Sequence, residues 1–341
     1  MGKKICIMRL SAIGDVCHAV AMVTRIQTQW PDAQITWVIG KVEHQLVKLM
    51  PNIRFIIFDK KRGKAAVKDL KHALKGEVFD ALLMMQVALR ANLASRVIKA
   101  KQRIGFDWAR SKELHWLFAN KRISANQHAH VLDGFMDFAD ALGVPSVDKP
   151  AWRIPVSNED SEWGLKQAKT LGKYVVIAPA ASKAERNWLP EQYARIAEYI
   201  QNNNVNVILC GGPGSLDRET ADAIKQRAGV TLQDFTGKTS LHQLLMLLKH
   251  AALVIAPDTG PAHMATTVDT PVVGLYAHSN PLRTGPYNNL NDVASVYDEC
   301  IKEQKGKSWQ ELPWGVRAKG DTLMQRISFE QVKEKVHPYI A

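Results

Sequence analysis

Residues 253–265 read Leu-Val-Ile-Ala-Pro-Asp-Thr-Gly-Pro-Ala-His-Met-Ala, an apolar run that ends in Asp258, Thr259, Gly260 and Pro261. This pattern predicts a buried strand, a tight turn and the start of a helix. The turn suits a phosphate group, because the first N–H groups of a helix have no partner within it and its dipole favours anions. Pro261 fits the first helical turn, where no N–H donor is needed.

Asp258 is unexpected beside a phosphate, because a carboxylate repels that group. It makes sense if it binds the hydroxyl groups of a sugar attached to the phosphate. The alternative is that Asp258 only caps the helix. The Thr-Gly-Pro sequence and the nearby His263 together favour the sugar-binding interpretation.

Working outward from this turn, strands and helices alternate along the whole chain. The length of 341 residues suits two domains of ordinary size. A strand at 4–10, a turn and a helix at 16–30 predict the opening of a doubly wound parallel sheet. A proline-containing linker is predicted at 143–155. In the second half, a strand, a small-residue turn and a helix recur four times, whereas 285–320 is predicted to be irregular.

The recurring turns bring several helix N-termini to one edge of a parallel sheet, an architecture that holds nucleotide diphosphates. The first turn has no GxGxxG fingerprint, and the glycine-rich turn at 211–215 lacks the Lys-Ser of a P-loop. Asp15 follows the first strand, where such folds bind ligands. It is either a helix cap or a general base that faces an interdomain cleft, and its spacing alone favours the cap.

The excess positive charge lies in the first half of the chain. Residues 1–150 contain 24 Lys and Arg against 13 Asp and Glu, whereas residues 151–341 contain 21 against 20. This asymmetry predicts an anionic partner: nucleic acid, an acidic membrane surface or a phosphorylated substrate. The alternative is a basic helix face exposed to solvent. Nucleic acid is disfavoured, because the chain has no helix-turn-helix, RRM or KH signature.

The four cysteines are far apart and lack CxxC spacing, which indicates reduced thiols in a cytoplasmic protein rather than a metal site or disulfide framework. No apolar run reaches transmembrane length. The N-terminus has no apolar segment or cleavage site typical of a secretory signal.

Four segments together resemble one enzyme family. They are Arg-Leu-Ser-Ala-Ile-Gly-Asp-Val at 9–16, Gln-Arg-Ile-Gly-Phe-Asp at 102–107, Arg-Asn-Trp-Leu-Pro at 186–190 and Pro-Asp-Thr-Gly-Pro-Ala-His at 257–263. In this order they resemble the ADP-heptose:lipopolysaccharide heptosyltransferases of glycosyltransferase family 9, and heptosyltransferase I in particular. The resemblance extends from about residue 3 to residue 337.

This resemblance implies an α/β fold of the GT-B type, in which two Rossmann-like, doubly wound domains face a cleft. Residues 1–155 would bind the acceptor and residues 156–325 the nucleotide sugar. Residues 326–341 would form a helix that crosses back and packs on the N-terminal domain.

The implied reaction is an inverting transfer of heptose from ADP-heptose to the Kdo/heptose inner core of lipopolysaccharide, with no metal ion and no further cofactor. The implied partners are the ADP-sugar donor and an anionic lipid A-core acceptor, with no nucleic acid. The protein would be cytoplasmic, with peripheral contact at the cytoplasmic face of the inner membrane. The alternatives are a family-9 transferase with a different sugar acceptor, or a nucleotide-sugar 2-epimerase of GT-B-like architecture.

The resemblance also assigns roles to individual residues. Asp15 would be the general base that takes the proton of the acceptor hydroxyl. The leaving phosphates would be held by either Lys183 or Arg186, and His263 would have either an orienting or a structural role. The donor would be bound by Ser182, Lys183, Arg186, Asp217, Glu219, Thr239, Asp258, Thr259, Gly260 and His263. The acceptor would be bound by Lys60, Arg62, Lys64, Arg90 and Arg110.

Overall fold

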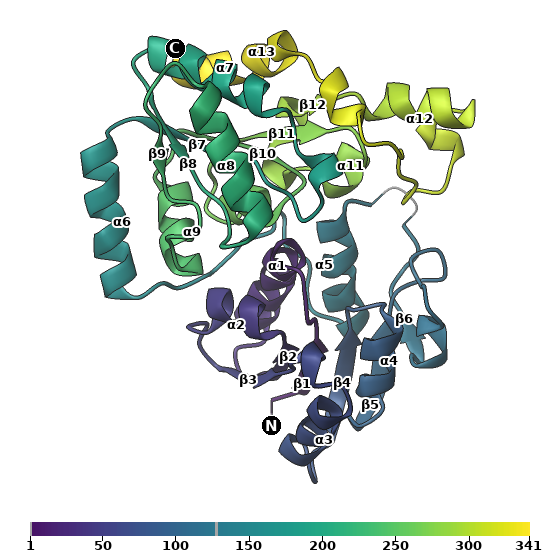
Figure 1. Ribbon diagram of the computed structural model, residues 1–341. Helices are drawn as coiled ribbons and strands as arrows, with labels where there is room; N and C mark the ends of the chain where they lie inside the picture. The colour runs from purple at the N-terminus through teal and green to yellow at the C-terminus, as the bar shows by residue number, and fades with distance from the viewer. Residues whose placement is uncertain (1, 127–128) are drawn as a thin grey trace. The chain divides into compact units, whose positions relative to one another are not determined.

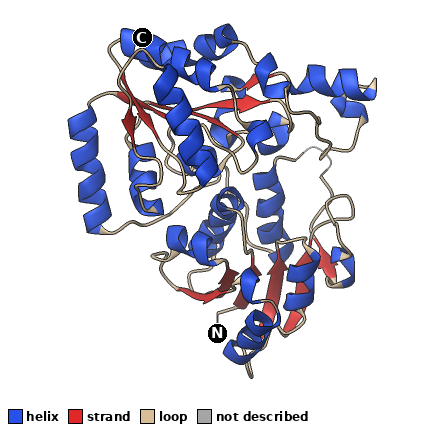
Figure 2. Cartoon of the chain, viewed as in Figure 1, coloured by secondary structure: helices blue, strands red, loops and turns tan. Residues whose placement is uncertain are grey.

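The computed structural model describes residues 2–126 and 129–341 of the chain. The chain divides into two compact units between Pro155 and Val156. Each unit is a sheet with helices on both faces (Figures 1 and 2), which confirms the predicted α/β fold of two Rossmann-like units. None of the helices in the described part of the chain is both long and apolar enough to span a bilayer.

The sheet of the first unit contains six parallel strands in the order β3-β2-β1-β4-β5-β6. The strands are β1 (Lys4–Met8), β2 (Gln34–Ile39), β3 (Ile53–Ile57), β4 (Phe79–Met84), β5 (Ala100–Gly105) and β6 (Lys121–Arg122). The helices are α1 (Ile13–Gln29), α2 (Lys41–Val47), α3 (Lys64–Ala73), α4 (Leu89–Ser95) and α5 (Val131–Leu142), with short 3-10 turns η1 (Lys60–Arg62) and η2 (His115–Leu117).

The central strands of this sheet are nearly continuous apolar runs because both of their faces are buried. Alternate side chains of β1 and β4, such as Cys6, Met8 and Leu82, pack against α3 and α4. On the other face, α1 packs along α5 (Figure 1). This three-layer packing fixes the turn after β1, which carries Asp15.

The second unit contains another six-stranded parallel sheet, in the order β12-β11-β10-β7-β8-β9. The strands are β7 (Tyr174–Ile177), β8 (Asn206–Leu209), β9 (Gln233–Asp234), β10 (Leu253–Pro257), β11 (Val272–Tyr276) and β12 (Ala294–Ser295). The helices are α6 (Asn158–Leu171), α7 (Pro190–Asn202), α8 (Ser215–Arg227), α9 (Leu241–Lys249), α10 (Gly260–Thr266), α11 (Pro281–Thr284), α12 (Tyr297–Lys305) and α13 (Phe329–Ile340), with 3-10 turns η3 (Ala184–Arg186), η4 (Tyr287–Asp292), η5 (Trp309–Glu311) and η6 (Leu323–Arg326).

The two sheets share one topology. Counted along the chain within each unit, the strand order is 3-2-1-4-5-6 in both. In such a sheet the direction of winding reverses between the first and fourth strands, and ligands bind there, outside the carboxyl ends of the strands. The switch points are therefore β1/β4 in the first unit and β7/β10 in the second. Asp15 follows β1, and Asp258 follows β10.

One part of the second unit differs from the prediction. Residues 285–320 are not all irregular, because they contain β12 and α12. The short helix α12 buries Tyr297, Cys300 and Ile301 among charged residues, which is a weak periodic signal. The buried face of the last helix, α13, is formed by Val332, Val336 and Ile340 and lies in the core of the second unit against α7 and β11. That residues 326–341 also cross back to the N-terminal domain stays a prediction.

Candidate active site

The turn between β10 and α10 has the predicted form. Residues 253–257 are a fully buried strand, and α10 begins at Gly260 with Pro261 in its first turn. The N-cap residue is Thr259, not Asp258, and no side chain caps the helix. The Thr259 hydroxyl is buried and has no hydrogen-bond partner among the described residues. Since Asp258 does not cap α10, the capping interpretation of this residue is wrong.

The Asp258 carboxylate is surrounded by side-chain donors from the next strand connection. Its Oδ2 accepts a hydrogen bond from Ser279 Oγ at 2.9 Å and one from Thr284 Oγ1 at 3.4 Å. His263 Nε2 lies 3.5 Å from Oδ1. Burial by itself would raise the pKa of Asp258, but His263, Ser279 and the positive charge of Arg186 outweigh it and hold the pKa below its usual value. The carboxylate is therefore ionised at neutral pH, and 17% of the side chain is exposed to receive a ligand.

The turn after β7 carries both candidate phosphate-binding cations. Arg186 is half-buried and lies close enough for its charge to act on Asp258 and on the Tyr276 phenol. Lys183 is exposed and its ammonium lies 3.5 Å from the Glu185 carboxylate. Ser182, next to it, is also exposed. The geometry thus favours Arg186 over Lys183 as the cation that acts beside Asp258.

His278 fixes this turn, although the sequence analysis gave it no role. Its side chain is buried, with Nε2 2.8 Å from the carbonyl oxygen of Glu185 and Nδ1 3.2 Å from that of Ala318. Ala318 N–H in turn donates to the carbonyl oxygen of His278. Trp188, just after the turn, is buried and donates from Nε1 to Ile327 O at 2.9 Å. These contacts hold Arg186 at the carboxyl edge of the sheet.

His278, Ser279 and Thr284 were not predicted as site residues. All three lie in one segment of the chain. They follow β11, the strand that pairs with β10. Carboxyl ends of adjacent parallel strands meet at one sheet edge, so polar residues after β11 lie beside Asp258. The signal was the polar sequence His-Ser-Asn directly after a buried strand. Asn280, the last of these, has a buried side-chain amide nitrogen with no partner within residues 2–126 and 129–341.

The remaining predicted donor residues lie on the turns that follow β8 and β9. Asp217, in the first turn of α8, accepts from Gly212 N–H at 2.7 Å and so closes the glycine-rich turn. Gly237 N–H donates to the carbonyl oxygen of Gly211 at 3.0 Å, which brings the turn that leads to Thr239 beside it. Thr239 is half-exposed, and Glu219 is exposed on α8. These turns lie at the same sheet edge as Asp258, but farther along it.

Asp234, at the end of β9, anchors these turns. Burial would raise its pKa, but Arg218 Nη2 at 2.6 Å and Thr236 N–H at 2.9 Å outweigh burial and lower the pKa to about 2. The folded-state pKa lies below the unfolded value, so the stabilisation is present above about pH 4 and is lost as the pH falls through about 2. We expect Asp234→Asn to lower the free energy of unfolding by about 2 kcal/mol at pH 7.

Urea unfolding of the two proteins at pH 7 and pH 2.5 measures this difference, which should shrink at the lower pH. Asp222→Asn is the matched control, since Asp222 bonds the same Arg218 at 2.9 Å but is half exposed. Its loss should stay below about 1 kcal/mol, as for other surface ion pairs. Equal losses for the two variants would contradict an anchoring role for Asp234.

Asp15 lies in the first turn of α1, at the switch point of the first unit. Its Oδ2 accepts from Ala12 N–H at 3.2 Å and forms an ion pair with the buried Arg9, which also donates to the carbonyl oxygen of Met85. The N-cap of α1 is therefore Ala12 and not Asp15, although the Asp15 carboxylate accepts the N–H of that N-cap residue. Yet both contacts use Oδ2, no bond to Oδ1 occurs among the described residues, and 34% of the side chain is exposed. One carboxylate oxygen of Asp15 therefore has no protein partner in this part of the chain.

Two of the predicted acceptor-binding residues lie next to this turn. Lys60 Nζ donates to Ser11 Oγ at 2.6 Å, and Arg90 Nη1 donates to the carbonyl oxygen of Lys60 at 3.3 Å. The other three are less directly placed. Arg62 pairs with Asp69 at 2.6 Å, and Lys64 is exposed at the start of α3.

The guanidinium of Arg110 forms ion pairs and a hydrogen bond with other residues of the first unit. It pairs with Asp107 and Asp137 and donates to the carbonyl oxygen of Ser124. The structure therefore places Lys60 against Ser11, in the turn that leads to Asp15, and Arg90 against Lys60, whereas Arg110 holds its own loop.

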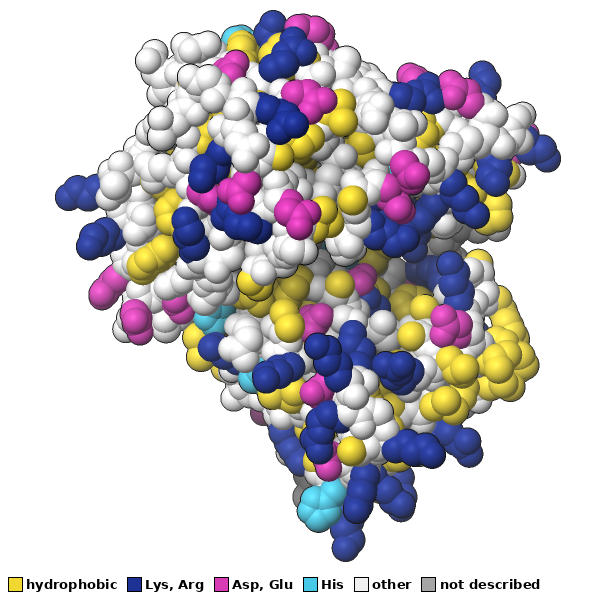
Figure 3. Space-filling view, in the orientation of Figure 1, with side chains coloured by type: hydrophobic (Ala, Val, Ile, Leu, Met, Phe, Trp, Pro, Cys, Tyr) yellow, Lys and Arg dark blue, Asp and Glu magenta, His cyan; other side chains and the backbone are white. Residues whose placement is uncertain are grey.

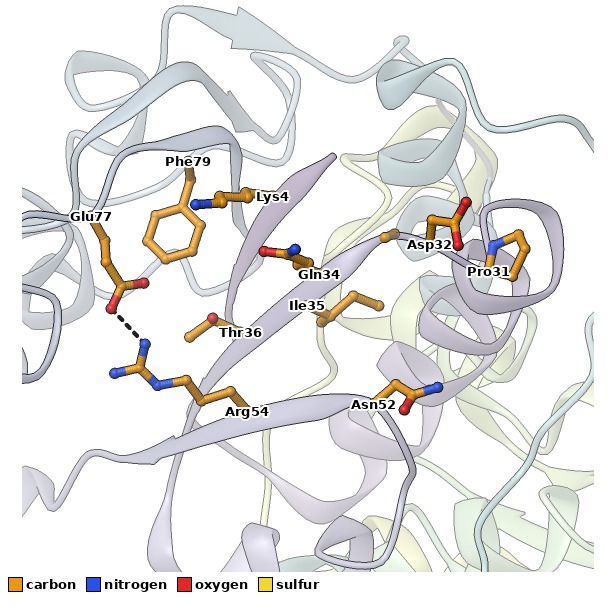
Figure 4. Close-up of a pocket in the computed structure, with 11 residues that line it drawn as sticks. Lys4, Pro31, Asp32, Gln34, Ile35, Thr36, Asn52, Arg54, Glu77 and Phe79 are labelled. Atoms are coloured by element: carbon orange, nitrogen blue, oxygen red, sulfur yellow. Dashed lines mark hydrogen bonds and ion pairs between the residues drawn. The ribbon is translucent and has the colours of Figure 1, made fainter. Parts of the chain in front are cut away.

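A hollow of about 500 Å³ lies at the opposite edge of the first sheet (Figure 4). It is lined by residues at the amino ends of the strands, including Lys4, Gln34 and Phe79. Arg54 and Glu77 form an ion pair at its rim, with 2.5 Å between their charged atoms. None of the predicted site residues lines it. Doubly wound sheets bind ligands at the carboxyl ends of their strands, so this hollow is not the candidate site.

Comparisons with known proteins agree with this geometry. Residues 67–312 match the model of "Glycosyltransferase family 9 (heptosyltransferase)". The chain is 47% identical over 330 residues to the lipopolysaccharide core heptosyltransferase OpsX of Haemophilus influenzae, covering 97% of this chain and 95% of the relative.

Solved structures share the fold. A family 9 glycosyltransferase from Veillonella parvula superposes with a TM-score of 0.79 at 21% identity, over 99% of this chain and 97% of the other. E. coli heptosyltransferase WaaC with ADP superposes with a TM-score of 0.77 at 19% identity, over 98% and 99%. The family model and the H. influenzae relative identify one family, and the paired switch points of the two sheets are consistent with it. The chain is therefore a glycosyltransferase that belongs to glycosyltransferase family 9, the heptosyltransferase family.

Proposed function

We propose that this enzyme transfers heptose from ADP-heptose to the Kdo/heptose inner core of lipopolysaccharide, with inversion at the anomeric carbon and without a metal ion. The name of the H. influenzae relative, a lipopolysaccharide core heptosyltransferase, supports the choice of sugar and acceptor. The observation that carries the mechanism is the carboxylate of Asp15, which is fixed through Oδ2 and leaves Oδ1 open at a switch point.

The donor would lie on the second unit. The Asp258 carboxylate, already a partner of Ser279 and Thr284, would accept hydrogen bonds from heptose hydroxyls. Arg186 and the buried, unpartnered hydroxyl of Thr259 would contact the diphosphate together with Gly260 N–H. His263 would orient Asp258, since its Nε2 lies 3.5 Å from that carboxylate. The turns that carry Asp217, Glu219 and Thr239 would bind the adenosine.

The reaction is a single displacement. The acceptor hydroxyl attacks the anomeric carbon of heptose while Asp15 Oδ1 takes its proton as general base. The bond between the anomeric carbon and the phosphate oxygen breaks through an oxocarbenium-like transition state, so one displacement inverts the configuration. ADP leaves with the electron pair, and Arg186 offsets its negative charge.

The acceptor would lie on the first unit, where the excess positive charge resides. Lys60 and Arg90, which lie next to the Asp15 turn, would bind phosphate or carboxylate groups of the lipid A core. Arg62 and Lys64 extend this basic region along η1 and α3. The reaction would take place in the cytoplasm, at the inner face of the membrane that holds the acceptor.

An assay with ADP-heptose and heptose-free, Kdo-terminated lipid A in EDTA tests this proposal. ADP release and the mass of the lipid are followed together. The gain of one heptose would support the donor, the acceptor and metal independence. Donor binding without transfer would indicate that the acceptor is a lipopolysaccharide core that already carries heptose. Epimerised ADP-sugar formed without an acceptor would identify the epimerase alternative, and loss of activity in EDTA that a divalent ion restores would contradict metal independence.

Asp258→Ala tests the sugar-binding role. We expect Kd for ADP-heptose to rise about 10- to 100-fold, because a charge-assisted hydrogen bond contributes about 1.5–3 kcal/mol. Kd for ADP should change less than threefold, since ADP lacks the heptose. Calorimetric titration with the two ligands measures both values. Equal losses of affinity for ADP and ADP-heptose would assign Asp258 a structural role. Asp258→Asn is the control, because it keeps the shape of the side chain and removes its charge.

A further inference from the structure

The first unit exposes a cluster of large apolar side chains away from its core. It consists of residues on α4 and on the loop that leads to β6, and we name it the Trp-Leu patch: Leu89, Leu93, Trp108, Leu114, Trp116 and Leu117. The rings of Trp108 and Trp116 lie 5.7 Å apart. Trp108 is 64% exposed and Leu117 is 57% exposed, so these side chains meet solvent although burial would stabilise them.

Polar contacts behind the patch join α4 to the loop. Asn92 is buried and bonds the carbonyl oxygen of Glu113 at 3.3 Å and His115 Nδ1 at 2.8 Å. His115 Nε2 accepts from Phe106 N–H at 3.2 Å, so Nδ1 carries the proton that is donated to Asn92. Leu89 N–H donates to the Glu113 carboxylate at 2.5 Å. The Asn92 amide of α4 and the His115 imidazole of the loop are therefore buried, whereas the indole and leucine side chains of the loop are exposed, the reverse of the usual arrangement.

The backbone of the loop has an uncommon conformation at two neighbouring residues. Glu113 and Leu114 both adopt a left-handed backbone, with φ of 50° and 59°, which residues with a side chain rarely do. Burial lowers the pKa of His115 to about 4, so this imidazole is neutral at physiological pH and keeps its two hydrogen bonds. The apolar side chains are thus presented outward by a specified structure.

The surroundings of the patch are strongly basic. Residues 86–126 contain nine Lys and Arg against two Asp and Glu, a net charge of +7. Arg122 lies over the Trp108 ring at 4.0 Å. Arg96, which directly follows α4, and Lys112, on the loop, are both exposed. Figure 3 shows hydrophobic side chains gathered over the region that Figure 1 labels α4 and β6, with Lys and Arg around them. Trp and Leu amid basic residues match the interface of a bilayer with anionic headgroups.

We propose that the Trp-Leu patch docks the protein on an anionic lipid bilayer, with the Trp and Leu side chains in the interfacial layer and the surrounding Lys and Arg against lipid headgroups. The patch adjoins the acceptor region, because α4 carries both Leu89 and Arg90, and Arg90 bonds Lys60. Docking here would therefore present those residues to a lipid-linked acceptor. This last consequence rests on the proposed function, whereas docking itself does not.

Vesicle binding tests the inference without donor or acceptor, so its failure is distinct from a failure of the proposed transfer. The full-length protein is sedimented with vesicles of phosphatidylcholine and phosphatidylglycerol at 70:30, and with vesicles of phosphatidylcholine alone. We expect binding to the mixed vesicles that falls with added salt, and at least tenfold weaker binding to the neutral ones. The double variant Trp108→Ser/Leu117→Ser should bind the mixed vesicles at least tenfold more weakly than the unaltered protein.

Leu165→Ser is the matched control, since Leu165 is 54% exposed on α6 of the other unit. It should bind the mixed vesicles within twofold of the unaltered protein. Arg96→Glu/Lys112→Glu, which leaves every apolar side chain in place, should weaken binding to the mixed vesicles at least fivefold. Brominated acyl chains should quench tryptophan fluorescence of the unaltered protein more than that of the double variant, and thermal melts check that each variant is folded.

Several outcomes would overturn the inference. One is the absence of binding to the mixed vesicles, and another is equal loss of binding in the Leu165 variant. A third is a dimer, detected by light scattering, that the double variant separates into monomers, because the patch would then be a contact between two copies of the chain.

Discussion

Asp15→Asn is expected to lower kcat for heptose transfer by about 10²–10⁴-fold, the usual contribution of a general base. Asn keeps the shape of the side chain and can still accept the Ala12 N–H, so the start of α1 should persist. It cannot take a proton from an acceptor hydroxyl. Steady-state release of ADP, with the acceptor at saturating concentration, measures the effect.

The controls for this variant separate chemistry from folding. Donor binding should be unchanged, since the Asp15 turn belongs to the first unit and the proposed donor site to the second. Asp32→Asn is a matched substitution at the amino edge of the same sheet, beside the hollow, and should keep kcat within twofold. Transfer by the Asp15 variant at a rate near that of the unaltered enzyme would leave Asp15 as a helix cap only.

Arg186→Ala is expected to lower kcat/KM by about 10²–10³-fold, the usual effect of removing one group that stabilises developing charge. The guanidinium is half-buried close to Asp258, where a leaving diphosphate would need a positive charge. Arg186→Lys keeps the charge but loses the bidentate hydrogen-bonding geometry. Its kcat/KM should therefore lie between those of the unaltered enzyme and Arg186→Ala. Kinetics with ADP-heptose as the varied substrate measure these effects.

Lys183→Ala is the matched control, because Lys183 lies three residues earlier on the same turn and is exposed beside Glu185. We expect its kcat/KM to stay within threefold of that of the unaltered enzyme. The reverse order, with a large loss for Lys183→Ala and a small one for Arg186→Ala, would assign the phosphate-binding role to Lys183 and contradict the role of Arg186.

Most of the fold could be predicted from the sequence because its signals are local. Runs such as residues 253–257 are apolar throughout, and each is followed by small or polar residues and a periodic helix. The elements that were missed carry weak local signals. β12 has only two residues, and α12 buries only one side of a highly charged helix.

The candidate site was predictable where one segment carries it. The Asp-Thr-Gly-Pro turn places Asp258 after β10, and the segment that ends in Asp15 does the same after β1. Contacts between segments depend on the strand order, which no single segment of sequence specifies. Ser279 and Thr284 reach Asp258 only because β11 pairs with β10, and His278 reaches Glu185 across 93 positions of the chain. The preference for Arg186 over Lys183 likewise depends on which of them faces Asp258.

The shared strand order of the two sheets has a consequence for how such enzymes diversify. Each unit has its own switch point and its own hydrophobic core, and the proposed base and the proposed sugar-binding carboxylate belong to different units. On the proposed roles, substitutions around Lys60 and Arg90 would alter which glycan is extended while leaving in place the packing that holds Arg186 and Asp258. A lineage would then acquire a new acceptor while it inherits the same activated sugar, and the exchange of one unit between relatives would give a new linkage.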